Sequence, residues 1–146
     1  MAAEPQQADR VELSKAARRL ELWRGPRLLA AYRVALGFAP TGHKEREGDG
    51  RTPEGTYAID ARNPKSSFHL SLRVSYPDAE DKARAAALGV PPGGDIYIHG
   101  KPNGWRKHFI GHPRRDWTTG CIAVTDRQMR EIWSLVPTGA RVVIRP

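Results

Sequence analysis

The sequence predicts a single, mainly β domain with two short helices. Three observations support this fold class. Apolar and polar residues alternate with a period of two in most of the chain, as they do in half-buried strands. Only two segments carry the start and stop signals of a helix. The 146 residues contain no glycine- or proline-rich linker, so we expect residues 9–146 to form one domain after a flexible N-terminal segment at residues 1–8.

Strands are predicted in the first half of the chain. Residues 10–39 carry spaced apolar residues on both sides of the turn Arg24-Gly25-Pro26, which indicates an opening hairpin. Residues 40–55 hold four glycines, two prolines and mixed charges, so we expect a surface loop there. Glu54 falls in this loop, and its replacement by alanine should cost less than about 0.5 kcal/mol. Residues 56–61 and 67–75 alternate with period two and predict two further strands.

Two helices are predicted in the second half. Residues 78–88 begin with an aspartate, have an alanine-rich middle and precede a glycine, as a capped helix does. Thr125 and Gln128 match a capping box, and the apolar stripe from Met129 to Val136 is assigned to the core. Strands are predicted at 95–99 and 141–144. Residues 100–116 show neither period, and a loop of this length in a compact domain is more often functional than accidental.

Composition limits the classes of function. The net charge of +8 favours an anionic partner, such as nucleic acid, a cell-wall polymer or acidic lipid. Aromatic residues are only 8% and no basic recognition helix is visible, so we expect no sequence-specific nucleic-acid binding. The apolar runs are too short for an integral membrane segment, and residues 1–9 lack the apolar centre of a secretory signal. The single cysteine excludes an internal disulfide.

Cys121 and His99 are the main candidates for catalysis. Cys121 follows two threonines and a glycine, and His99 ends a predicted strand 22 residues upstream. A thiolate is a strong nucleophile and imidazole accepts protons near neutral pH, so the pair is the minimum apparatus for acyl transfer through a thioester. The carbonyl of Gly100 could fix the tautomer of the histidine. Thr119 and Gly120 leave room for a substrate, and consecutive N–H groups there could form an oxyanion hole.

Each candidate also has a simpler structural interpretation. Cys121 could be an inert core residue, and His99 a satisfied histidine at a strand end. Arg115, Trp117 and Thr118 could contact substrate, with Arg114 and Trp105 beside them in the sequence. A solvated basic loop explains the arginines equally well, and core packing explains the tryptophans.

A metal site is a further alternative. His108 and His112 are four residues apart and could join His99 and Cys121 around a zinc ion. The glycine and proline on either side of His112 disfavour the helix that this spacing needs, and there is no second cysteine. We therefore expect no metal.

Three motifs taken together resemble the L,D-transpeptidase catalytic domain, also called the YkuD domain. They are Gly50-Arg-Thr-Pro-Glu-Gly-Thr-Tyr57, Ile98-His99-Gly100 and Thr118-Thr119-Gly120-Cys121-Ile122. The resemblance covers about residues 9–146 and is greatest to the murein transpeptidase branch with a long loop between histidine and cysteine. It implies a domain of the β-sandwich or barrel type.

The resemblance also implies an activity on peptidoglycan. Cys121 would attack the carbonyl of the third residue of a stem tetrapeptide and release D-Ala, and an amine from a second stem, or water, would resolve the thioester. His99 would be the base, Gly100 its carbonyl partner, and Thr119, Gly120 and Cys121 the oxyanion region. No metal or organic cofactor is implied. The family works outside the cytoplasmic membrane, so we expect a periplasmic or cell-envelope location if the protein is exported.

Two positions depart from the family pattern. Thr119 stands where the family usually has histidine, and Ala123 where many members have arginine or asparagine. Three hypotheses follow. The first is an L,D-transpeptidase; the second is an L,D-carboxypeptidase, or an amidase releasing protein from peptidoglycan, with the same acyl-enzyme but a hydrolytic end. The third is a non-catalytic module that binds an anionic polymer.

Overall fold

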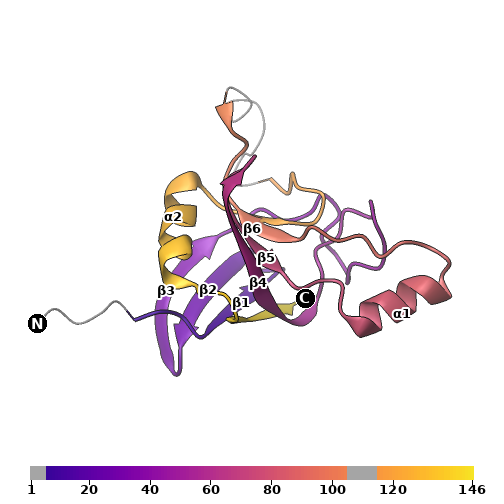
Figure 1. The fold of residues 1–146 in the computed structure, drawn as a ribbon, viewed down its shortest axis with the longest axis horizontal. Coiled ribbons are helices and arrows are strands. Elements are labelled where there is room, and N and C mark those ends of the chain that lie inside the picture. The colour runs from indigo at the N-terminus through magenta and orange to yellow at the C-terminus, as the bar shows by residue number, and fades with distance from the viewer. Residues whose placement is uncertain (1–5, 105–114) are drawn as a thin grey trace, which may run out of the picture.

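The structure is a computed structural model that describes residues 6–104 and 115–146 (Figure 1). Within these residues it confirms a mainly β fold with two helices. The strands are β1 (Arg10–Ser14), β2 (Arg19–Arg24), β3 (Arg27–Arg33), β4 (Gly55–Ser66), β5 (His69–Val74), β6 (Tyr97–His99), β7 (Ile122–Ala123) and β8 (Arg141–Arg145). The helices are α1 (Ala79–Ala87) and α2 (Asp126–Leu135).

The strands form a single sheet that curls until its two ends meet. Their order is β3-β2-β1-β8-β4-β5-β6-β7. Beyond β3, Ala35 bridges to Ala123 and Gly37 bridges to Thr118, so the chain after the first edge strand pairs with the region of the last. A twisted sheet closes in this way when its edges can hydrogen-bond. The closure places the loop at residues 34–54 against the segment that contains Cys121.

Two parallel pairings tie distant parts of the chain together. β8 lies between β1 and β4, parallel to the first and antiparallel to the second. β7 is parallel to β6. The core lies inside the curled sheet, where alternate residues of the strands are buried, such as Val11 and Leu13 in β1 and Val142 and Ile144 in β8.

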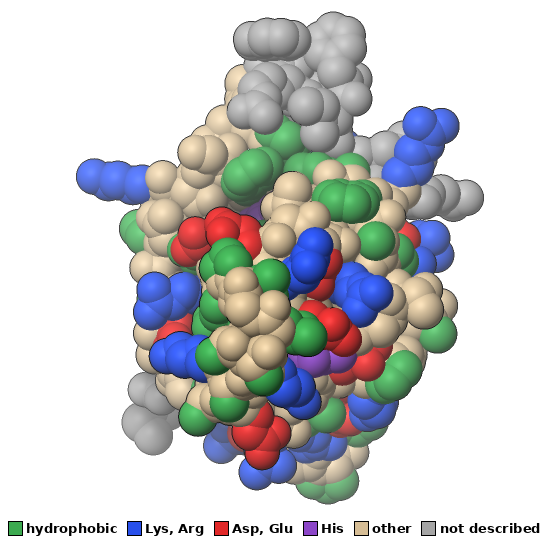
Figure 2. Space-filling view, turned by 90° about the vertical axis from the view of Figure 1, so that its right-hand side faces the viewer, with side chains coloured by type: hydrophobic (Ala, Val, Ile, Leu, Met, Phe, Trp, Pro, Cys, Tyr) green, Lys and Arg blue, Asp and Glu red, His purple; other side chains and the backbone are tan. Residues whose placement is uncertain are grey.

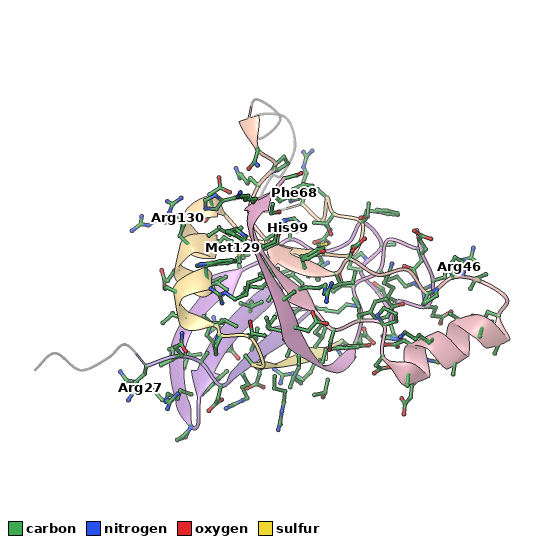
Figure 3. The ribbon with its side chains drawn as sticks, in the orientation of Figure 1. Arg27, Arg46, Phe68, His99, Met129 and Arg130 are labelled. Carbon is green, nitrogen blue, oxygen red and sulfur yellow. The ribbon has the colours of Figure 1, made fainter. Side chains whose placement is uncertain are left out.

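Both helices begin at capping boxes. In α1, Asp78 and Asp81 each accept a hydrogen bond from the other's backbone N–H, and in α2 Thr125 and Gln128 do the same. The expected stripe of α2 is in the core, because Met129 faces the sheet and is fully buried (Figure 3). The two helices lie at opposite sides of the molecule, α1 far from α2 (Figure 1).

Arg62 fixes the C-terminal end of α2 to β4. Its guanidinium donates to the carbonyl oxygens of Val136 at 2.6 Å and Trp133 at 2.9 Å. It also lies 4.0 Å from the centre of the Trp133 ring. These contacts satisfy carbonyls that a helix end leaves without partners, and they add a cation–π interaction.

Some details differ from the sequence prediction. The N-terminal region forms three strands instead of one hairpin, and β4 continues unbroken to Ser66. β7 was not predicted, since a strand of two residues has no detectable period. Ala8 is buried and its N–H donates to the carbonyl of Leu135 at 2.7 Å, so packed structure begins before β1.

Candidate active site

The parallel pairing of β6 with β7 sets the position of Cys121. Ile98 is opposite Ile122 and His99 is opposite Ala123, so Cys121, one residue before β7, lies beside Tyr97. The backbone N–H of Tyr97 donates to the Cys121 sulfur at 3.4 Å. The thiol in turn donates to the carbonyl oxygen of Asp95 at 3.2 Å. The sulfur is thus held by the backbone that leads into the strand ending at His99.

His99 is buried, with one ring nitrogen fixed. Its Nδ1 lies 2.6 Å from the carbonyl oxygen of Gly100, which only an Nδ1–H can satisfy by donating. The other nitrogen, Nε2, then carries the lone pair. The ring packs against Phe68 at a centroid distance of 4.6 Å and meets Trp117 edge-on at 5.7 Å. Phe68 and His99 lie side by side in Figure 3.

The turn before Cys121 is built around the hydroxyl of Thr118. The hydroxyl donates to the carbonyl of Cys121 at 2.8 Å and accepts from the N–H of Gly120 at 3.1 Å. Thr118 is buried, whereas Thr119 is exposed. The Gly120 N–H is therefore already used inside the turn. Among the described residues the Cys121 N–H has no partner within the protein, so it is the better candidate oxyanion donor.

Close backbone packing behind the turn requires glycine. A Cβ on Gly120 would lie 2.9 Å from the carbonyl oxygen of Arg51, and its φ of +139° is one that other residues rarely adopt. A Cβ on Gly37 would overlap the carbonyl of Gly50. Gly100 is similarly confined, since a Cβ there would lie 2.5 Å from a carboxylate oxygen of Asp126.

Burial keeps both reactive groups uncharged at neutral pH. It raises the pKa of the Cys121 thiol to about 11, an effect that the Tyr97 N–H opposes and the nearby Asp95 carboxylate reinforces. It lowers the pKa of His99 to about 4, against the hydrogen bond to Gly100. The resting site thus holds a thiol and a neutral imidazole, not a preformed thiolate–imidazolium pair.

A cavity of about 620 Å³ opens beside these groups. The β6 side contributes Asp95, Tyr97 and His99, and the turn contributes Trp117, Thr118, Thr119 and Cys121. The opposite wall comes from the β4–β5 hairpin, with Asn63, Ser66, Ser67, Phe68 and Ser71. The cavity is large enough for part of a peptide and offers both aromatic and hydroxyl surfaces.

Buried charges support the site from behind. Lys44 is 3% exposed, and its ammonium binds Asp49 at 2.9 Å. The same Asp49 carboxylate accepts backbone N–H bonds from its own loop, including that of Arg51 at 3.1 Å, and its pKa is lowered although burial opposes this. On another side Asp116 accepts from Arg18 at 2.8 Å and from the Leu36 N–H at 3.0 Å, which anchors the segment before Trp117.

The structure brings most of the predicted site residues together. Cys121, His99, Thr119, Trp117 and Thr118 line the cavity. The carbonyl oxygen of Gly100 accepts a hydrogen bond from the His99 ring, and Gly120 lies in the turn before Cys121. Arg115, by contrast, is exposed and does not line the cavity. Trp105, His108, His112 and Arg114 lie outside the described residues.

Four further residues at the site were not predicted from the sequence: Phe68, Asp95, Tyr97 and Lys44. One signal could have found two of them, because side chains two apart on a strand share a face and Asp95, Tyr97 and His99 follow that spacing. Phe68 and Lys44 reach the site only through tertiary packing. No group of three or more His, Cys, Asp or Glu residues that could hold a metal is found within the described ranges.

His43 is a structural contact outside the cavity. Its Nδ1 accepts from the Glu54 N–H at 2.7 Å and its Nε2 lies 2.8 Å from Asp81. Asp81 also accepts from the Asp78 N–H at 3.0 Å and from the Tyr57 hydroxyl, and these bonds hold the pKa of that buried carboxyl at about 2 although burial alone would raise it. The network joins the loop to α1.

Among residues 6–104 and 115–146, neither helix is long and apolar enough to cross a membrane.

Comparison with curated proteins identifies YafK as a relative. The chain is 28% identical over 121 residues to YafK of Escherichia coli (strain K12), which covers 82% of this chain and 41% of YafK. The chain therefore spans about two fifths of the length of that relative.

Solved structures share the fold. The helical cell shape determining protein Pgp2 from Campylobacter jejuni superposes with a TM-score of 0.72 at 23% identity, over 96% of this chain and 48% of Pgp2. An L,D-transpeptidase from Xylanimonas cellulosilytica gives 0.61 at 16% identity, over 98% of this chain and 63% of that one. The family model of the L,D-transpeptidase catalytic domain, YkuD, matches residues 8–144. With nearly its whole length matched, the chain belongs to the YkuD family of L,D-transpeptidase catalytic domains.

Proposed function

We propose that the protein is a cysteine L,D-transpeptidase that cross-links peptidoglycan through a thioester on Cys121. The acyl donor is a stem tetrapeptide, the leaving group is D-Ala, and a second stem supplies the attacking amine. One observation carries the proposal above the others: Cys121 and His99 line the same cavity, and the bond from His99 Nδ1–H to Gly100 leaves Nε2 available for a proton.

Acylation begins from the neutral pair. The Cys121 S–H turns from the Asp95 carbonyl toward His99 Nε2, and the proton moves to this nitrogen as the S–C bond forms. Because the pKa of His99 is lowered to about 4 by burial, the imidazolium is a strong acid. It protonates the leaving nitrogen when the C–N bond of the tetrahedral intermediate breaks, which releases D-Ala and restores the neutral imidazole.

The second half-reaction reverses these roles. The acceptor amine attacks the thioester carbon and passes a proton to His99 Nε2, the C–S bond breaks, and the proton returns to the sulfur. In both halves the carbonyl oxygen gains negative charge. The Cys121 N–H supports this oxygen, with the N–H of Thr119 as the second donor, since the Gly120 N–H between them already binds Thr118.

Family membership and the fold support an action on the cell wall, and we infer a periplasmic or cell-envelope location. Pgp2, which shares the fold, is described as a cell shape determinant.

No single sign of charge dominates the face in Figure 2, where acidic and basic side chains are interspersed. A broad anionic-polymer surface is therefore not visible on that face.

The deciding experiment incubates the protein with a tetrapeptide-stem muropeptide, with and without a second stem. Intact-protein mass follows the acyl-enzyme and product masses follow the peptides, in parallel with Cys121→Ala. A Cys121-dependent adduct with loss of D-Ala and a cross-linked dimer is the expected result.

Other products would redirect the assignment. A tripeptide without dimer would identify an L,D-carboxypeptidase, and release of peptidoglycan-bound protein would identify an amidase. Salt-sensitive polymer binding that Cys121→Ala leaves intact, without any adduct in the original protein, would instead indicate a binding module.

A further inference from the structure

The charge inside the cavity is the starting point. Among the described lining residues Asp95 is the one carboxylate, and no Lys or Arg lines the cavity. The other walls are aromatic, hydroxyl and amide groups. A substrate that buries a cationic group near Asp95 would therefore gain an ion pair, whereas a buried anion would meet no compensating charge from these residues.

Asp95 contacts the nucleophile through its backbone and presents its side chain to solvent. Its carbonyl oxygen accepts the Cys121 thiol at 3.2 Å, and its residue is exposed. Its φ of +54° is in the left-handed region, which asparagine and aspartate tolerate better than most residues. Glycine would adopt this conformation without strain, as Gly93 does nearby with a φ of +79°. A carboxylate at this position is thus compatible with the backbone but not required by it.

The Asp95 carboxylate has no salt-bridge partner among the described residues. Its one side-chain contact there is a long hydrogen bond of 3.4 Å from the Tyr97 hydroxyl. Arg73, which is opposite Tyr97 in the sheet, is a nearby cation among the described residues, and it is bound to Asp60 at 2.7 Å. The carboxylate therefore remains available to a ligand at the mouth of the cavity.

We propose that the Asp95 carboxylate binds a primary ammonium group of the peptide substrate. This inference rests on the proposed transpeptidation. Donor and acceptor are both stem peptides, so the amine that the acceptor uses is also present on the donor. The same chemistry could thus come from either peptide, and the two sources act at different half-reactions. An acceptor would bind as the ammonium and lose one proton to solvent before its nitrogen attacks the thioester.

Such an ion pair would also act on the nucleophile. In the empty site the negative charge of Asp95 adds to the burial that keeps Cys121 protonated. An ammonium placed on the carboxylate neutralises that charge when the substrate is in position. The thiol would then lose its proton more readily with substrate bound than without it, so binding and activation are linked through Asp95.

The test compares Asp95→Asn with the original protein. Asparagine keeps the size and tolerates the left-handed backbone, so the fold should persist. Glu80→Gln in α1 removes the same charge from an exposed position that does not line the cavity, and serves as the control. Acylation is measured by intact mass with a stem tetrapeptide whose amine is free and with its N-acetylated form.

If the ammonium belongs to the donor, Asp95→Asn should lower kcat/KM for acylation by the free-amine peptide about tenfold, whereas kcat/KM for the acetylated peptide should not fall. If it belongs to the acceptor, acylation by either peptide should not slow. Aminolysis of the preformed acyl-enzyme should slow by a similar factor, while its hydrolysis should not. Without substrate, Asp95→Asn should also raise the rate of Cys121 alkylation by iodoacetamide at pH 8 about threefold or more.

Failure of this inference can be told from failure of the proposed function. If the original protein is acylated but Asp95→Asn treats free-amine and acetylated peptides as the original does, and aminolysis is unchanged, ammonium binding is wrong and transpeptidation stands. If the original protein is acylated by neither peptide, the proposed function is wrong, and the inference that rests on it falls too.

Discussion

The ammonium nitrogen of Lys44 lies 3.7 Å from the position that a Cβ of Gly120 would occupy. A buried positive charge thus stands directly behind the turn that carries Cys121, and it opposes the effect of burial on the thiol. Asp49, its partner at 2.9 Å, holds the lysine in place. The charge stabilises a thiolate without touching a substrate, so Lys44 is a positioning residue.

We expect Lys44→Met to raise the pKa of the Cys121 thiol. Alkylation by iodoacetamide at pH 8 should slow about three- to tenfold, because a smaller fraction of the thiol is ionised. Lys44→Arg should recover most of the rate, since it keeps the charge. Equal rates for Lys44→Met and the original protein would exclude an electrostatic role.

Lys15 is a matched control for this experiment. It is also 3% exposed, but its ammonium binds the carbonyls of Gly42 and Thr52 at 2.8 and 2.7 Å, not a group in the turn. Lys15→Met should lower thermal stability while leaving the alkylation rate of Cys121 unchanged. A similar slowing in both variants would point to general loosening of the fold.

The ionisation state of the resting site predicts a particular pH profile. Since the pKa of Cys121 is raised to about 11 by burial, the thiolate fraction should rise about tenfold per pH unit between pH 7 and 10. The alkylation rate should follow it without a plateau below pH 9. A preformed thiolate–imidazolium pair would instead give a rate that is already level near pH 6, and a stopped-flow pH series decides between the two.

His99→Ala should slow acylation by roughly 10²-fold or more, since the general base for the thiol is removed. Intact-mass time courses with the tetrapeptide stem measure the rate, and far-UV circular dichroism checks folding. His43→Ala is the control histidine, because His43 joins the loop to α1 outside the cavity. An acylation rate for His99→Ala equal to that of the original would remove the imidazole from the mechanism.

Thr118 and Thr119 are adjacent but should respond differently to replacement by valine. Thr118→Val removes a hydroxyl that makes two hydrogen bonds in the nucleophile turn, which should cost about 1–3 kcal/mol of unfolding free energy and slow acylation. Thr119→Val changes an exposed side chain and keeps its N–H, so both quantities should stay close to those of the original. Denaturant unfolding and acylation rates test the pair, and a large loss of rate in Thr119→Val would assign a role to its hydroxyl.

The structure revises the expectation for Glu54. Its carboxylate lies 3.1 Å from the ammonium of the buried Lys15. Burial lowers the pKa of Lys15 and Glu54 opposes that shift, so Glu54→Ala removes the balancing charge. The two carbonyl acceptors of Lys15 remain in the variant and limit the damage. We therefore expect Glu54→Ala to lower the free energy of unfolding by about 1–3 kcal/mol, measured by urea unfolding. A loss of unfolding free energy below about 0.5 kcal/mol would instead support the interpretation of Glu54 as a simple surface-loop residue.

Local structure was largely readable from the sequence, because its signals lie within a few residues. The capping box from Thr125 to Gln128 marked the start of α2, and alternation marked strands such as β8. Cys121 and His99 could be singled out from their chemistry and their neighbours. The contact of His99 with the adjacent Gly100 carbonyl, also local, could be foreseen as well.

Tertiary structure decided what surrounds the reactive groups. The parallel register of β6 and β7 puts Cys121 beside Tyr97, and sheet closure brings Lys44 behind Gly120. The stacking of Phe68 on His99 joins residues 31 positions apart in the chain. No local pattern encodes such contacts, because they arise when strands pair over long separations. Burial, which sets the pKa of the thiol and the imidazole, exists only once the whole sheet has closed.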